Sequence, residues 1–375
     1  MIVRCRVLFT PFEELRDVDI VIEGGKVTAL RSSTATDEEV IRAEYVIPGL
    51  IDPHTHMGLY RLEGETGDHG FEVSDPVTPH LSVSDAVDVF DPAFKDAMMA
   101  GVTCVGILPG SYMSFGSSVE KITIMPGQGS IYKTNGKLVK RTACIKAAVG
   151  EHPKRFLSEQ KLVPTTRMGI IAELRAVLSK AKEYMESGSK DKRDPKLEAL
   201  VPLLKGEIPL RVHVHTVQDI DTVLKLADEF GLKIILDHAT EAYALSDSLK
   251  DVPIVYGPIV FARRGTELKN LDSANVSKMK NLNFCLTTDH PTIPIQYLDL
   301  LSSLTLAHGY SLKEALKLIT INAARILDIE DRVGSIEVGK DADLVLLSGE
   351  PLLAKTKVLM TIIDGEIVFK AGELG

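Results

Sequence analysis

The stretch Val46-Ile-Pro-Gly-Leu-Ile-Asp-Pro-His-Thr-His56 decides the fold, because an apolar run stops there at two histidines. Side chains two residues apart on a strand point to the same face, so His54 and His56 can meet one ion. Neutral imidazole is a usual ligand of zinc and related metals. A pair of surface or packed histidines is the competing interpretation. The apolar context and the further candidates downstream favour a metal site.

Short apolar runs with strand character alternate with helical patterns through the middle of the chain. The runs that we interpret as strands are 46–52, 103–108, 130–133, 143–149, 210–214, 233–237, 254–256 and 284–288. Amphipathic helical patterns are clearest at 169–187, 220–230, 295–308 and 311–326. This alternation predicts an α/β fold, a (β/α)8 TIM barrel over residues 47–331. The third strand is uncertain, since residues 122–125 compete with 130–133.

Both ends of the chain carry short strand patterns that are too small to fold alone. These patterns are 2–8, 18–23 and 26–30 at the N-terminal end, and 342–347, 358–363 and 366–370 at the C-terminal end. Isolated hairpins are marginally stable. We therefore predict that residues 1–46 and 332–375 pair into one small discontinuous β-sandwich.

The net charge and the apolar content of the chain indicate which classes of binding partner do not suit it. The 375-residue chain carries a net charge of −9 with no basic stripe, which argues against nucleic acid or an anionic membrane. No apolar run reaches about 18 residues, the length that indicates a membrane span. The N-terminus alternates charged and apolar residues, unlike a signal peptide. We expect a cytoplasmic protein that binds a small-molecule substrate, and a symmetric homo-oligomer is compatible with the sequence.

More candidate ligands occur at the ends of the predicted strands. His213 and His215 close the fifth strand, His238 follows the sixth and Asp289 follows the eighth. The C-terminal ends of barrel strands face one rim, where barrel enzymes keep their active sites. Each residue alone is equally well explained as a core histidine or a capping aspartate. Their shared position predicts a common metal site.

Longer motifs contain these candidates. They are Pro48-Gly-Leu-Ile-Asp-Pro-His-Thr-His56, Arg211-Val-His-Val-His-Thr216, Asp237-His238, Thr288-Asp289-His-Pro291, Asn322-Ala-Ala-Arg-Ile-Leu327 and Gly334-Ser-Ile-Glu-Val-Gly-Lys-Asp-Ala-Asp-Leu344. With these motifs the chain resembles metal-dependent hydrolases of the amidohydrolase superfamily, in the imidazolonepropionase-related branch. The resemblance covers nearly the whole chain and is specific for the superfamily rather than for a substrate.

The resemblance implies a role for each strand-end residue. His54, His56 and His213 would be metal ligands, and Asp289 would be a ligand that also moves protons in catalysis. His238 would bind a second metal or, with one metal, face the substrate and help to stabilise the oxyanion as a catalytic residue. One or two divalent ions are implied as cofactor, with zinc favoured and iron or manganese as alternatives.

The number of ions depends on the fourth strand, because some relatives bridge two ions there with a carbamylated lysine or a glutamate. Thr142-Ala-Cys-Ile-Lys-Ala-Ala-Val-Gly-Glu-His-Pro153 offers Lys146 and Glu151 as tentative metal ligands. A lysine inside an apolar strand is costly unless it is neutralised or paired. Glu151 is as well explained as a loop acid or a helix-terminal acid.

Three further residues are candidates for substrate contact. His215 lies on the same side as His213, and there we favour substrate contact over direct ligation. Arg263 follows the seventh strand, where a guanidinium would grip a substrate carboxylate, although a solvated basic pair with Arg264 explains it as well. Tyr112 ends the second strand and is assigned to the pocket on similar grounds.

These residues predict a hydrolase that cleaves a C–N bond other than an ordinary protein peptide bond. The substrate would be an amide, a cyclic amide, or an N-acyl or dipeptide-like compound, attacked by metal-activated water with Asp289 as proton shuttle. Deaminase relatives usually carry a glutamate at the position of Thr216, so deamination is an alternative, as is lactone or phosphotriester hydrolysis. A non-catalytic pseudo-enzyme is disfavoured because every core ligand is present.

Overall fold

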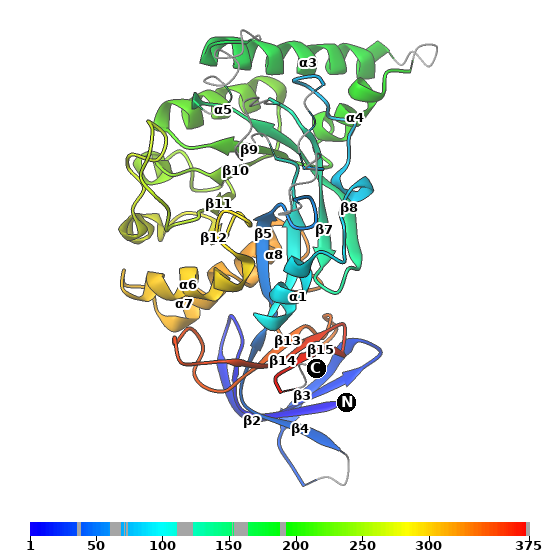
Figure 1. The fold of residues 1–375 in the computed structure, drawn as a ribbon, viewed down its shortest axis with the longest axis vertical. Coiled ribbons are helices and arrows are strands. Elements are labelled where there is room, and N and C mark those ends of the chain that lie inside the picture. The colour runs from blue at the N-terminus through cyan, green and yellow to red at the C-terminus, as the bar shows by residue number, and fades with distance from the viewer. Residues whose placement is uncertain are drawn as a thin grey trace.

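In the computed structural model, the chain forms a barrel-like sheet with helices packed against it. A second sheet lies at one end of this barrel (Figure 1). The structure describes residues 1–35, 39–60, 69–70, 72, 74–110, 123–151, 153, 164–187 and 193–372. The first and the last strand of the chain both belong to the second sheet (Figure 1). The predicted barrel with additional β-structure from both chain ends is therefore confirmed.

The barrel sheet contains eight strands in the order of the chain. They are β5 (Leu50–Thr55), β6 (Val102–Ile107), β7 (Gly127–Lys133), β8 (Leu138–Ala148), β9 (Leu210–Val214), β10 (Ile234–His238), β11 (Ile254–Tyr256) and β12 (Phe284–Leu286). The helices within the described residues are α1 (Pro92–Met99), α3 (Arg167–Ser187), α4 (Pro195–Leu204), α5 (Val217–Phe230), α6 (Leu298–Leu306), α7 (Leu312–Leu318) and α8 (Ile321–Ile326). Short 3-10 helices lie at Val83–Asp85, Ala242–Leu245, Ser273–Met279 and Ile295–Tyr297.

The third barrel strand departs from the regular pattern. Strand β7 pairs antiparallel with both β6 and β8, whereas the other neighbouring pairs are parallel. The β7–β8 connection contains Asn135-Gly136, with Gly136 at φ 90°. Asn-Gly between strand patterns is a strong hairpin signal, and it gives the local reason for the reversal. Of the competing residues 122–125, those that the structure describes lie outside the named strands, so the third strand is β7.

The C-terminal helical pattern is also divided. The predicted helix at 311–326 is two helices, because α7 ends at Leu318 and α8 begins at Ile321. The break turns α8 towards the inside of the barrel. There Ile321 and Ala324 share one apolar cluster with the barrel residues Ile51 and Val255. Helix α8 therefore packs against the apolar interior of the barrel.

The barrel closes between its first and last strands. Thr55 forms a parallel bridge with His290, just after β12. Below it, the buried carboxylate of Asp52 accepts hydrogen bonds from Oγ1 of Thr287 at 2.5 Å and from the backbone N–H of Thr288 at 3.1 Å. Burial raises the pKa of Asp52 to about 6, against the opposing effect of these hydrogen bonds. The seam brings the ends of β5 and β12 side by side.

The second sheet joins the two ends of the chain. Its strands are β1 (Ile2–Phe9), β2 (Glu14–Glu23), β3 (Lys26–Ser32), β4 (Val40–Pro48), β13 (Leu344–Leu347), β14 (Val358–Ile363) and β15 (Glu366–Lys370). Strand β4 pairs parallel with β1 and antiparallel with β13, so it links the N-terminal and C-terminal parts. Val3, Ile20, Leu344 and Ile362 share one core. Among the described residues, no helix is long and apolar enough to cross a membrane.

A buried lysine connects the β7–β8 hairpin to the second sheet. The side chain of Lys133 is 1% exposed, and its Nζ lies 2.7 Å from Asp343, 3.2 Å from Asp364 and 3.3 Å from Asp341. Asp343 and Asp364 flank β13 and β14 of the second sheet. Removing the cation would leave buried carboxylates without compensation, which is costly.

We predict that Lys133→Ala lowers the free energy of unfolding by about 3–5 kcal/mol, because it breaks a buried ion pair from one side. Urea unfolding followed by circular dichroism measures the change. The matched control is Lys137→Ala, whose exposed ammonium also pairs with Asp364 and should contribute no more than about 1 kcal/mol. Equal effects of the two substitutions would contradict the prediction.

Candidate metal centre

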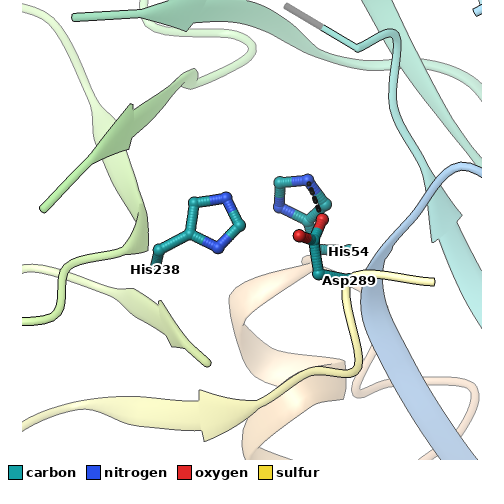
Figure 2. Close-up of side chains that lie close together, drawn as sticks. All are labelled: His54, His238 and Asp289. Carbon is teal, nitrogen blue, oxygen red and sulfur yellow. Dashed lines mark ion pairs between the residues drawn. The ribbon is translucent and has the colours of Figure 1, made fainter. Parts of the chain in front are cut away.

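Histidines from separate barrel strands meet one aspartate at the rim (Figure 2). Nε2 of His54, in β5, lies 3.5 Å from Oδ1 of Asp289, and Nε2 of His56 lies at the same distance. The rings of His54 and His238 are 4.9 Å apart between centroids. The potential ligand atoms of His54, His238 and Asp289 all lie within 4.8 Å of one another. The strand ends therefore bring together three of the predicted ligands, with His56 beside them.

Backbone carbonyls fix the orientation of two of these rings. Nδ1 of His56 lies 2.7 Å from the carbonyl oxygen of Leu108, and Nδ1 of His238 lies 2.7 Å from that of Gly257. A carbonyl only accepts hydrogen bonds, so Nδ1 carries the proton in each ring and Nε2 keeps a lone pair. Metal-ligating histidines are usually held in this way by a partner of the other ring nitrogen.

Two of the site residues adopt left-handed backbone conformations. His238 has φ 66° and Asp289 has φ 54°. In regular strand geometry His238 would face away from the side occupied by Asp237, because neighbouring side chains alternate. The left-handed turn brings its ring to the cluster. Such strain is concentrated at functional sites in proteins.

Burial and charge set the protonation of the group. Burial lowers the pKa of His54 and of His238 below the ordinary value. Burial alone would raise the pKa of Asp289, but the neighbouring His238, His56 and His54 outweigh it, and the pKa falls. Neutral imidazoles beside an ionised carboxylate are the forms that bind a divalent cation.

A layer of buried charge lies next to the histidines. The carboxylate of Asp237 forms ion pairs with Lys146 of β8 and Arg211 of β9. Its Oδ1 also lies 3.2 Å from Nδ1 of His54. Arg211 donates a further hydrogen bond of 2.7 Å to the carbonyl oxygen of Pro53. The layer ties β5, β8, β9 and β10 together beside the site.

Comparison with known proteins agrees with this arrangement. The model of the amidohydrolase family matches residues 45–368. The chain belongs to the amidohydrolase family. In its general class it is therefore a metal-dependent hydrolase, and the family acts on C–N bonds. The resemblance seen in the sequence motifs is confirmed at this level.

Individual relatives support the same assignment. The crystal structure of an amidohydrolase from Thermotoga maritima MSB8 aligns with a TM-score of 0.92 and 34% identity, over 98% of this chain and 99% of that one. An imidazolonepropionase of Fusobacterium nucleatum is 22% identical over 95% of this chain and 90% of its own length. Amidohydrolase tasK of Hapsidospora irregularis is 24% identical over 94% of this chain, which spans only 40% of that protein.

The tentative ligands of the fourth strand lie in different surroundings. The ammonium of Lys146 is paired with Asp237, and burial lowers its pKa. Oε2 of Glu151 lies 3.4 Å from Nη2 of Arg167. Glu151 does not belong to the groups of histidine and carboxylate ligand atoms found among the described residues. Their assignment as metal ligands stays a prediction.

Two of the three substrate-contact candidates, His215 and Arg263, lie among the described residues. The ring of His215 packs 4.7 Å from that of His213, and its Nδ1 lies 2.7 Å from Oγ1 of Thr240. The half-exposed Arg263 donates to the carbonyl oxygen of Leu271 at 2.7 Å and pairs with the side chain of Asp272. The guanidinium of Arg263 therefore stabilises the loop that contains it. Tyr112 lies outside the described residues.

One acidic residue of the site had no sequence signal. Glu267, in the loop after β11, is 6% exposed, and a carboxylate oxygen lies within 4.8 Å of ligand atoms of His213 and His215. It stands in Gly265-Thr-Glu-Leu-Lys269, which has the polar composition of a solvated loop. No strand end or periodic pattern marks it. Only the path of the loop over the rim brings it to the histidines.

We predict that Asp237→Asn lowers the free energy of unfolding by about 3–5 kcal/mol, because it leaves two buried cations without their shared anion. Urea unfolding measures the loss. Asp221→Asn is the matched control, since this exposed residue pairs with Lys225 one turn away on α5, and such pairs contribute about 0.3–0.5 kcal/mol. A loss no larger than that of the control would show that the charge layer does not stabilise the barrel.

Proposed function

We propose that this protein hydrolyses a C–N bond in a small amide-type substrate. The substrate class is an amide, a cyclic amide, or an N-acyl or dipeptide-like compound. The observation that carries the proposal is the approach of Asp289 to Nε2 of both His54 and His56, with His238 alongside. Such a cluster provides both a cation site and a carboxylate that can exchange protons with a substrate.

The donor set suits a divalent ion. Imidazole nitrogens and one carboxylate are the usual ligands of catalytic zinc, and iron or manganese also accept them. His54, His56, His238 and Asp289 would hold the ion, with His213 next to His238 at 4.6 Å between ring centroids. When bound, a divalent ion lowers the pKa of water towards about 7 and polarises a carbonyl.

Asp289 is the proposed proton carrier. The carboxylate is ionised at neutral pH, which is the form that can accept a proton from the attacking water. It then returns that proton to the departing nitrogen, which leaves as an amine. General acid–base help of this kind contributes about 10²–10⁴ in rate.

His238 is better suited to ligation than to donating a hydrogen bond to the oxyanion. Its Nδ1 proton is directed to the carbonyl oxygen of Gly257. Because burial lowers the pKa of His238, a second proton on Nε2 is disfavoured. The lone pair on Nε2 then faces the cluster as a ligand.

Thr216 favours amide hydrolysis over deamination. Its hydroxyl donates to Oδ2 of Asp219 at 2.6 Å and caps the N-terminus of α5. The position at which deaminases usually carry a glutamate therefore serves helix capping in this chain. A neutral hydroxyl used in that way supplies no acid for a ring nitrogen.

We predict that removing metal with a chelator abolishes turnover and that zinc, iron or manganese restores it. The assay is a screen of N-acyl amino acids, dipeptides and cyclic amides, with amine release and ammonia release measured separately. Ammonia from an aminated ring without amine release would favour deamination. Full turnover in metal-free protein would exclude the proposed mechanism.

We predict that Asp289→Asn lowers kcat by about 10²–10⁴, because asparagine carries no exchangeable acid proton. Asp221→Asn, on the exposed face of α5, is the control and should retain the original kcat. Metal content is measured on both proteins to separate loss of proton transfer from loss of the ion. An Asp289→Asn enzyme with unchanged kcat would assign the proton transfer to another group.

A further inference from the structure

A second group of potential ligands lies beside the first. Ligand atoms of His213, His215 and Glu267 all lie within 4.8 Å of one another. The ring of His213 is also 4.6 Å from that of His238, which belongs to the first group. Two sets of imidazole and carboxylate donors therefore adjoin at the rim.

The two histidines of the second group are positioned by strand β9 and its continuation. They are two residues apart, so the pleat places both side chains on one face. Thr240 holds Nδ1 of His215 at 2.7 Å, which leaves Nε2 at the opposite edge of the ring. The rings meet edge to face, with centroids 4.7 Å apart. Both imidazoles are thus held next to Glu267.

Glu267 is held in place from several directions. Its Oε1 accepts the backbone N–H of Glu151 at 2.7 Å. A Cβ on Gly150, which has φ 102°, would lie 2.5 Å from that oxygen, so glycine at this position makes room for the carboxylate. Asn270, three residues further along the loop, donates to Oε1 of Glu241 at 2.6 Å. The loop and the strand end together fix a buried acid at the rim.

We propose that His213, His215 and Glu267 bind a second divalent cation. Two imidazoles and one glutamate form a complete protein ligand set for zinc, with further positions open to water or substrate. A nearby cation also compensates for burying the carboxylate. This assignment gives Glu267 and His215 the role that the sequence offered to Lys146 and Glu151. The proposed second site depends on the proposed function only in assuming that a first ion is bound nearby by His54, His238 and Asp289.

The test is the metal stoichiometry of the full-length protein. Metal-free protein is loaded with Zn²⁺, passed through a desalting column and analysed by mass spectrometry for zinc per chain. The original protein should hold about two ions, and Glu267→Gln should hold about one, because a neutral amide is a weaker ligand than a carboxylate. Loading with Co²⁺ adds a second readout, since loss of one site should reduce the visible absorption.

His215→Asn provides an independent variant if Glu267→Gln does not fold. Asparagine can keep the contact with Thr240 through an atom near the position of Nδ1, but it lacks Nε2. Glu229→Gln is the matched control, because it removes an exposed carboxylate of α5 that pairs with Arg175 and should leave both ions bound. Circular dichroism confirms that each variant is folded.

The outcomes separate this inference from the proposed hydrolase. Retention of both ions in folded Glu267→Gln and His215→Asn would overturn the second site and direct attention to Lys146. One ion in the original protein, with turnover that still needs metal, would overturn the second site and leave the proposed function intact. No bound ion and metal-independent turnover would overturn both.

Discussion

One buried carboxylate, Asp237, controls the surroundings of the candidate metal centre. It is paired with Lys146 and Arg211 and lies next to His54, so residues of three other strands depend on one anion of β10. Charges removed from water are costly unless they are paired, which makes any shift of these strands relative to one another unfavourable. Arg211 is two residues before His213 on the same face of β9. The charge layer therefore also sets the position of a histidine at the rim.

The strained backbone follows from the same arrangement. Asp237 already occupies the inward-facing position of β10, and a regular strand would direct His238 away from it. A left-handed conformation at His238 resolves the conflict, and Asp289 adopts a similar one. Such conformations cost roughly 1–2 kcal/mol per residue. The surrounding contacts, including the hydrogen bond from His238 to Gly257, have to offset that cost.

The reversed third strand changes what the barrel offers at its rim. Strand β7 runs opposite to its neighbours, so its C-terminal end with Lys133 lies towards the second sheet. The carboxylate near His213 and His215 comes instead from a connecting segment, because Glu267 lies in the loop after β11 and is held there by the backbone N–H of Glu151. The β7–β8 hairpin thus contacts the second sheet through Lys133, while the loop after β11 supplies the carboxylate of Glu267 to the rim.

Much of the fold could be predicted from local sequence. Apolar runs and helical periodicity located most strands and helices, and the motifs at strand ends identified His54, His56, His238 and Asp289. The direction of β7 was missed because the alternating pattern was assigned to a parallel barrel, although Asn135-Gly136 is a hairpin signal. The break between α7 and α8 follows from packing against the barrel interior, which periodicity does not encode.

By itself, the sequence determined the barrel class, the extra β-structure from both ends and the histidines at the strand ends, because these depend on neighbours along the chain. Only the tertiary structure decided that Asp237 joins Lys146 and Arg211 and that Glu267 reaches His213. Those contacts join residues that are far apart in the chain. Their formation depends on strand register, backbone turns and loop paths, which a local pattern does not specify.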